Sequence, residues 1–248
     1  MRLPRHRLLL GLLAGIATAL VAGPVLAQSL NIDLGGGPGS ATSRIVQLVA
    51  LTTVLSIAPS ILVMITSFTR SVVVLSFLRQ ALGTQQSPPN MVMISLALFL
   101  TAFVMAPTFE KAWDTGLQPM IDGHIDEMEG FERAIKPFHA FMSRNVRPQD
   151  LKLFMDLSRA KEVATAEEVP LTALIPAFMI SELRRAFEIG FLVFLPFLII
   201  DMVVASVLMS MGMMMLPPSM ISLPFKLIFF VMVDGWYLVV GSLVQSYG

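Results

Sequence analysis

The chain has 248 residues, of which 55% are hydrophobic and only 14% are charged, whereas a soluble domain carries roughly 25% charged residues. This composition argues against a water-soluble globule and predicts a membrane protein. The 17 Lys and Arg residues balance the 17 Asp and Glu residues, so there is no overall basic field to hold DNA or RNA. Because the sequence contains no cysteine, disulfides, thiolate metal sites and cysteine nucleophiles are excluded.

Residues 1–27 have the pattern of a cleavable secretory signal. Three arginines precede an uncharged apolar run, and small residues surround the expected cleavage site after Ala27. The run is short for a bilayer span, which takes about 20 residues. We expect removal of this segment, and the alternative is an uncleaved anchor helix. Residues 28–43 contain a glycine-rich run and are expected to form a flexible exported tail.

Four apolar stretches predict an all-α membrane fold, since lipid offers no partner to an unpaired backbone group. They cover residues 45–66, 91–106, 189–216 and 220–244. As a helix, the third stretch would be about 42 Å long, against a hydrocarbon core of ~30 Å. This excess length indicates helices that pack against one another as well as against lipid.

The distribution of charged residues separates a polar middle part of the chain from two apolar parts. Most of them fall in residues 110–188, which we interpret as a polar helical insert between a first helical hairpin (44–109) and a second one (189–248). Together these parts make one domain of residues 44–248. Within the insert, one helix is expected to begin at Pro148 and another near Pro170.

The orientation of the hairpins follows from the segment between the first two apolar stretches. Residues 67–90 contain Arg70 and Arg79 and no acidic residue, so the positive-inside rule predicts a cytoplasmic loop there. With the signal removed, the insert and the C-terminus then lie on the exported side of the membrane.

Methionines are concentrated at the end of the third apolar stretch. Three interpretations stay open: flexible thioether side chains that close a gate around a passing chain, simple filling of a helix interface, and a Cu(I) site in a Met-lined membrane carrier. Pro217 and Pro218 are expected to end the helix, which places the methionines in its last turns and in the turn beyond and favours the gate. The residues concerned are Met209, Met211, Met213, Met214 and Met215.

Charged residues in the apolar stretches and at their entrances form a second set of candidates. They are Glu182, Arg185, Asp201, Lys226 and Asp234. Intramembrane charges are costly unless they are paired or face water, so each is a functional candidate. Asp201 or Glu182 is expected to pair with Lys226, within one chain or between copies. The alternative is that these charges have only a structural role and hold helices together.

Catalysis is not expected from these carboxylates. Asp201 and Asp234 lack the glycine-flanked surroundings of intramembrane aspartic proteases, and the sequence contains no HExxH motif. It also contains no Walker sequence. We therefore predict a protein that is not an enzyme, has no cofactor and has no resident metal.

Two long blocks resemble the FliP family of flagellar biosynthesis proteins, the core of the type III secretion export gate. They are the run from Thr66, TSFTRSVVVLSFLRQALGTQQSPPNMVMISLALFLTAFVM, and the C-terminal LPFKLIFFVMVDGWYLVVGSLVQS. The resemblance covers residues 45–248 and leaves the tail of residues 28–43 outside.

This resemblance implies a subunit of a pentamer that assembles with FliQ and FliR at the flagellar basal body. Other flagellar export proteins, the rod, membrane lipid and unfolded export substrates are its further implied partners. It also implies that the methionine segment is a gasket at the constriction, and that Glu182 and Lys226 form a charged contact between neighbouring subunits. The equivalent gate of a virulence injectisome is the related alternative.

Overall fold

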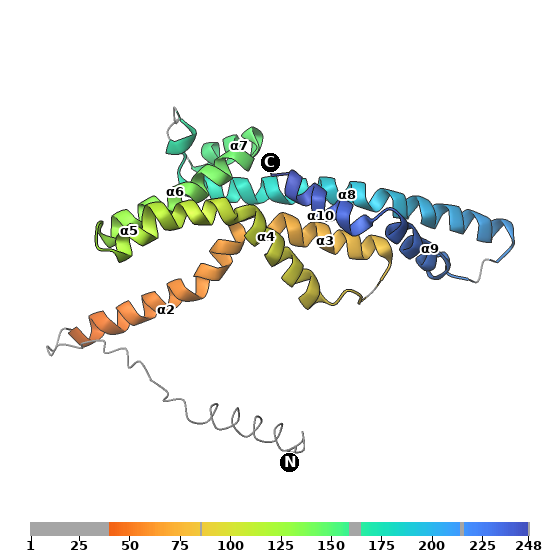
Figure 1. Ribbon diagram of the computed structural model, residues 1–248, viewed down its shortest axis with the longest axis horizontal. Helices are drawn as coiled ribbons and strands as arrows, with labels where there is room; N and C mark the ends of the chain where they lie inside the picture. The colour runs from red at the N-terminus through yellow and green to blue at the C-terminus, as the bar shows by residue number, and fades with distance from the viewer. Residues whose placement is uncertain (1–39, 85, 159–164, 214–215, 248) are drawn as a thin grey trace, which may run out of the picture. The chain divides into compact units, whose positions relative to one another are not determined.

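The computed structural model describes residues 40–84, 86–158, 165–213 and 216–247. All secondary structure in these ranges is helical, without a strand, which confirms the predicted all-α class. The predicted signal peptide and nearly all of the expected tail lie outside the described residues. The elements are α2 (Ser40–Met64), α3 (Phe68–Leu82), α4 (Asn90–Ala112), a π-helix (Trp113–Leu117), α5 (Gln118–Ile121), α6 (Glu127–Asn145), α7 (Pro148–Ser158), a 3₁₀ turn (Ala166–Glu168), α8 (Leu171–Ser210), α9 (Pro218–Met232) and α10 (Gly235–Gln245) (Figure 1).

The chain divides into two compact units between Thr53 and Val54. In the first unit, the described residues form the beginning of α2. The second unit contains the rest of α2 and the helices from α3 to α10. All the contacts discussed below lie within this second unit.

Helix α3 occupies most of the segment that was expected to be a loop, so the expected loop structure was wrong, while the cytoplasmic location of this segment stays a prediction. It packs mainly against α8 and also against α4, and its Val74, Leu75 and Leu78 are fully buried. From sequence, this segment was assigned to a loop because it contains two arginines and no acidic residue. One of these, Arg70, is nevertheless buried with the rest of the helix, because its partner comes from a distant part of the sequence.

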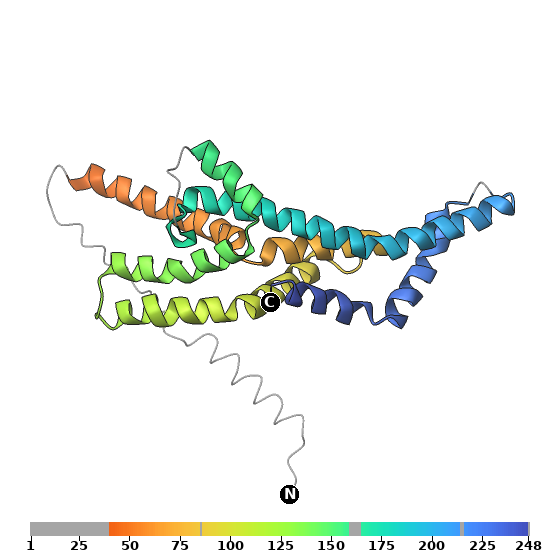
Figure 2. The same cartoon turned by 90° about the horizontal axis from the view of Figure 1, so that it is seen from above.

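Helix α8 is one uninterrupted helix of 40 residues, about 60 Å long at ~1.5 Å per residue. Its start after Pro170 confirms the predicted helix of the insert. It continues through residue 188, where the insert was expected to give way to the second hairpin, and it contains Pro176 and Pro196 in its interior. In Figure 2, α8 lies alongside α3, and it also packs against α6, α7 and α9.

Two groups of buried side chains hold the second unit together. The first joins α3, α4, α8, α9 and α10 and includes Leu75, Leu100 and Phe197. The second joins α4, α6 and α8 and includes Phe141 and Phe178, whose rings meet edge to face at 5.8 Å between centroids. Helices α4 and α8 contribute to both groups, so they connect the polar insert to the apolar hairpins.

One helix of the polar insert begins at the residue that the sequence predicts, and another begins at a side-chain cap. Helix α7 begins at Pro148, the position that proline favours at a helix start. Helix α6 begins after Asp126, whose carboxylate accepts a 2.7 Å hydrogen bond from the Glu129 backbone amide. This N-cap satisfies one of the amides that have no partner within the helix.

The apolar helices keep much of their surface exposed. Asn90–Ile121 and Leu171–Ser210 are each long and apolar enough to cross a membrane, and two bent helix pairs raise the count of candidate spans in the described residues to four. Only 11% of the most apolar window of the longer helix is buried. Such a surface is stable only against lipid or other protein, in agreement with the predicted membrane class.

Candidate functional site

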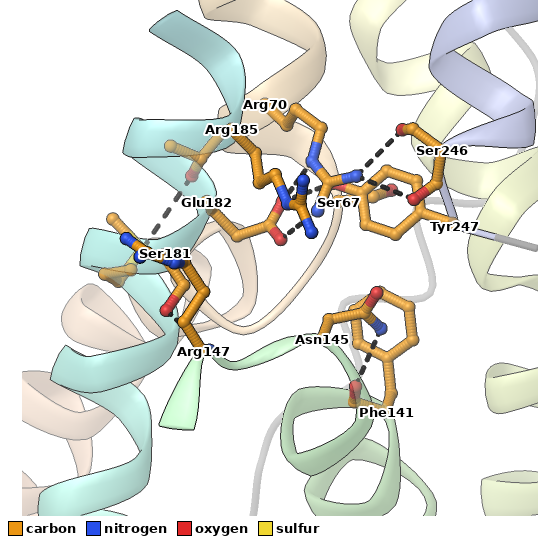
Figure 3. A network of polar contacts seen from close by, with 12 residues as sticks. Ser67, Arg70, Phe141, Asn145, Arg147, Ser181, Glu182, Arg185, Ser246 and Tyr247 are labelled. Carbon is orange, nitrogen blue, oxygen red and sulfur yellow. Dashed lines mark hydrogen bonds and ion pairs between the residues drawn. The ribbon is translucent and has the colours of Figure 1, made fainter. Parts of the chain in front are cut away.

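A buried ion pair joins α3 to α8 at the centre of the second unit. Arg70 Nε lies 3.0 Å from Glu182 Oε2, and Arg70 Nη2 lies 2.5 Å from Glu182 Oε1 (Figure 3). The two side chains are only 2% and 0% exposed. This two-bonded geometry is the one in which a planar guanidinium binds a carboxylate most strongly.

The C-terminal end of the chain completes this buried pair. Arg70 Nη1 donates to Ser246 Oγ at 2.8 Å and to the Ser246 carbonyl oxygen at 3.1 Å. The Arg70 guanidinium also lies over the Tyr247 ring, 3.7 Å from its centroid, and the Tyr247 hydroxyl donates to Glu182. We call Arg70, Glu182, Ser246 and Tyr247 the central polar network.

Tyr247 is held in its neutral, donating form. Burial, and next the negative charge of Glu182, raise the pKa of Tyr247 well above its ordinary value. The Tyr247 ring also stacks on Phe141 of α6, with 5.8 Å between centroids. The last residues of the chain are thereby connected to α3, α6 and α8.

A second ion pair joins α8 to α9. Lys226 Nζ lies 2.6 Å from Asp201 Oδ2 and donates a 3.2 Å hydrogen bond to the Ala81 carbonyl oxygen. The Ser222 hydroxyl donates to the other Asp201 oxygen at 2.5 Å. Ala81 belongs to the last turn of α3, where carbonyl groups lack helical partners. Lys226 is 5% exposed and connects three helices.

Of the two pairings expected for Lys226, the one with Asp201 is present within the chain. Glu182 and Lys226 each have a different partner here, so the charged contact between neighbouring subunits stays a prediction. Sequence reasoning did not single out Arg70 as the partner of Glu182. The sequence did indicate that Arg70 needs a distant partner, because Arg70 is charged, lies in an apolar block and has no acidic residue near it in the sequence.

The remaining two charged candidates lie at the surface. Arg185 is exposed, and its Nη1 atom lies 3.7 Å from Glu188 Oε2. Glu188 is also 3.0 Å from Arg184 Nε, which is the i, i+4 pairing expected on a solvated helix face. Asp234 is exposed at the beginning of α10.

The Val-Asp-Gly-Trp motif forms the 63° bend between α9 and α10. Asp234 has a left-handed backbone with φ of +51° and makes no capping hydrogen bond to a described residue. A Cβ atom on Gly235 would lie 2.1 Å from Phe230 Cε2, so only glycine allows this close approach. The motif therefore has a structural explanation, as a tight turn.

Helix α8 ends at Ser210, earlier than the prolines that were expected to stop it. Gly212 adopts a positive φ of +73°. The Met213 amide donates to the Leu208 carbonyl at 3.0 Å, and the Gly212 amide donates to the Met209 carbonyl at 3.1 Å. These are the two hydrogen bonds of a Schellman motif, so a glycine ends the helix.

The methionine segment thus begins in the last turn of α8 and continues beyond it. Met209, Met211 and Met213 are 58%, 62% and 43% exposed. Large apolar side chains at this exposure are available to a neighbouring molecule. Met214 and Met215 lie outside the described residues.

Together, these features define an integral membrane protein of packed helices. Its buried charges lie in ion pairs that join helices, and its apolar side chains extend over an exposed surface. Among the described residues, no group of three or more His, Asp or Glu side chains has the geometry of a metal site.

Comparison with known proteins identifies the family. Residues 51–243 match the FliP family. The chain is 61% identical over 244 residues to flagellar biosynthetic protein FliP of Caulobacter vibrioides, an alignment that covers 98% of this chain and 91% of the relative. The proteins of the same name in Bacillus subtilis and Rhizobium meliloti are 55% and 52% identical over 220 and 236 residues, covering 89% and 94% of this chain and 99% and 96% of the relatives. The chain belongs to the FliP family.

Membership in this family defines the apparatus to which the chain belongs and its location in the cell. The chain is a non-enzymatic component of the flagellar export apparatus, and its partners are other components of that apparatus. The family confirms the prediction that the chain is not an enzyme. Its location is the inner membrane.

Proposed function

We propose that the chain is a subunit of the flagellar type III secretion export gate and forms part of the pore through which unfolded flagellar proteins cross the inner membrane. The observation that carries this proposal is the match of residues 51–243 to the FliP family. The flagellar names of the three relatives favour the flagellar apparatus over an injectisome. The same match disfavours the Met-lined Cu(I) carrier.

The methionine segment is the proposed gate. Unbranched thioether side chains change shape easily, so a ring of them seals tightly when the pore is empty and yields when a substrate chain passes. The exposure of Met209, Met211 and Met213 at the end of α8 supports this role. The full proposed gate is formed by Met209, Met211, Met213, Met214 and Met215 of several copies.

The proposed assembly is a pentamer of this chain together with FliQ and FliR, in contact with the other flagellar export proteins, the rod and membrane lipid. The exposed apolar side chains of α8 and α9, among them Ile199, Val203 and Phe225, support it, since neighbouring subunits or lipid must cover such a surface. The gate is passive: other components of the apparatus drive the unfolded substrates through it. Nucleic acid has no part in the proposal.

We further propose that the polar insert and the C-terminus lie on the periplasmic side. The many charged residues of α6 and α7 support a watery location for the insert. Because the chain has no natural cysteine, single cysteines report its orientation cleanly. Asp156→Cys in α7 should react with a membrane-impermeant maleimide in cells whose outer membrane is permeabilised. Labelling only after the inner membrane is disrupted would contradict this orientation.

The gate function is tested by deletion of the gene. Cells that lack the chain should release no hook or filament protein into the culture supernatant and should not swim, and the intact gene should restore both. A Gly241→Ala variant is the matched control, because a Cβ atom there meets nothing within 4 Å. Normal export by the deletion strain would disprove the proposal.

A further inference from the structure

A cavity of about 490 Å³ lies beside the central polar network and is lined by residues of α3, α4, α6 and α8 and by the C-terminal residues Ser246 and Tyr247. Its charged lining residues are Arg70, Lys111, Arg144 and Arg185, and no carboxylate of the described residues lines it. Arg70 and Arg185 are both labelled in Figure 3, next to Tyr247, which forms another part of the wall. The cavity is therefore surrounded by four cationic side chains from four different helices.

These cations are not neutralised equally. Glu182 neutralises Arg70. Among the described residues, the one ion pair of Arg185 is a long 3.7 Å contact with Glu188, which also lies 3.0 Å from Arg184. Lys111 and Arg144 have no ion pair within the part of the chain that the structure describes. The cavity consequently carries an excess of positive charge, which favours an anion.

We propose that this cavity binds the phosphate group of an anionic phospholipid. Guanidinium groups match phosphate oxygens geometrically, and basic pockets between membrane helices are suited to anionic headgroups. The volume is also appropriate, since ligand pockets commonly measure about 300–1,000 Å³. The proposal depends on the membrane location of the chain and not on its role as a gate.

The surface of α4 distinguishes a lipid from a free anion. Pro107 and Lys111 line the cavity, and Phe103 and Phe99 precede Pro107 at intervals of four residues, so adjacent members of this row share a helix face. Both phenylalanines are exposed, at 64% and 69%, and α4 is part of a candidate membrane span. An acyl chain lies along these rings when the headgroup is in the cavity. Neither inorganic phosphate nor an acidic peptide would use both features.

The test measures lipid binding to the full-length chain, purified in mild detergent and stripped of lipid. Native mass spectrometry and thermal unfolding would compare phosphatidylglycerol, phosphatidylcholine and inorganic phosphate as probes. We expect phosphatidylglycerol to bind and to raise the unfolding temperature, and the other two to do so at least tenfold more weakly. Equal binding of phosphatidylcholine would overturn the proposal. Tight binding of inorganic phosphate alone would reassign the cavity to a free anion.

Matched variants locate the site. The double variant Lys111→Gln, Arg144→Gln removes the two cations without an ion pair and should weaken phosphatidylglycerol binding at least tenfold. Lys136→Gln, Lys152→Gln removes the same charge from exposed positions of the insert outside the cavity and should leave binding unchanged. Equal weakening in both would mean nonspecific attraction and would overturn the proposal. The proposal would also be overturned if the Lys111→Gln, Arg144→Gln variant lost self-association in lipid-free detergent but bound phosphatidylglycerol as before. That result would assign the cavity to an acidic segment of a second copy of the chain.

Discussion

Arg70 and Glu182 lie 112 residues apart in the sequence and meet in a fully buried ion pair that joins α3 to α8. A buried pair contributes little net stability compared with a well-packed apolar pair, but removal of one partner leaves an uncompensated charge in the interior. The first prediction follows from this asymmetry.

Glu182→Gln should lower the free energy of unfolding by about 3–5 kcal/mol, because Arg70 then remains charged and buried without its counterion. Chemical unfolding of the detergent-solubilised chain, followed by circular dichroism, would measure the loss. Glu188→Gln is the control on the same helix, since Glu188 is solvent-exposed and its pairs with Arg184 and Arg185 are screened. Equal losses in the two variants would show that the buried pair has no special role.

Exchange of charges would show which pair Lys226 forms in the assembled protein. Asp201→Lys and Lys226→Asp should each reduce secretion of hook protein, and their combination should partly restore it, because the two side chains meet within one chain at 2.6 Å. The comparison is the combination Glu182→Lys, Lys226→Glu. Rescue by this second combination alone would instead support the contact between subunits that the family resemblance implies.

The Tyr247 side chain makes two separable contributions. Tyr247→Phe loses the hydrogen bond to Glu182 but keeps the stacking on Arg70 and Phe141, so a loss of about 1.5–3 kcal/mol is expected for a hydrogen bond to a charged group. Tyr247→Ala also removes the ring and should cost about 3–5 kcal/mol. Thermal or chemical unfolding would rank the variants. Identical stabilities of the two variants would mean that the ring contributes nothing.

The bend between α9 and α10 predicts different results for two glycines of one helix. Gly235→Ala should cost about 1–3 kcal/mol, because the new methyl group overlaps the Phe230 ring, and should lower the amount of chain in the membrane. Gly241→Ala has open space around its Cβ position and should be harmless. Immunoblots of membrane fractions, with hook secretion as a second readout, would compare them. Normal levels of the Gly235 variant would contradict the tight-turn interpretation.

The methionine gate predicts an ion leak. Replacing Met209, Met211 and Met213 by alanine should raise the ion permeability of membranes that contain the assembled gate, because small side chains cannot close the pore. Met202→Ala is the control, since Met202 is also exposed on α8 but lies two turns before the segment. Ion permeability would be measured by dye release or membrane potential in cells without export substrate. Unchanged permeability would contradict the gasket.

Apolar runs and proline placement predicted α2, α4, α7 and α8, and one stretch where the structure has the two helices α9 and α10. The all-α class, the start of α7 at Pro148 and the start of α8 after Pro170 all follow from local rules that need no knowledge of distant contacts. The family and its two characteristic sequence blocks were also recognisable. These features depend on residues that are neighbours in the sequence.

The features that sequence reasoning did not predict depend on contacts between distant residues. Helix α3 resembled a loop because the Glu182 that neutralises Arg70 is far away in the sequence. The continuous α8 resembled two helices because its surroundings change from polar to apolar near residue 188 while its backbone does not. The end of α8 was assigned to Pro217, whereas the backbone conformation of Gly212 ends it first.

The separation of Arg70 from Glu182 also constrains the order of events during synthesis. A ribosome adds about 5–20 residues per second, so Arg70 waits on the order of ten seconds before Glu182 has been made. Throughout this time, α3 carries an unpaired charge that the bilayer interior disfavours by about 2.5–3.5 kcal/mol. We therefore expect the first hairpin to reach its final position only after α8 has been made, when Glu182 can pair with Arg70.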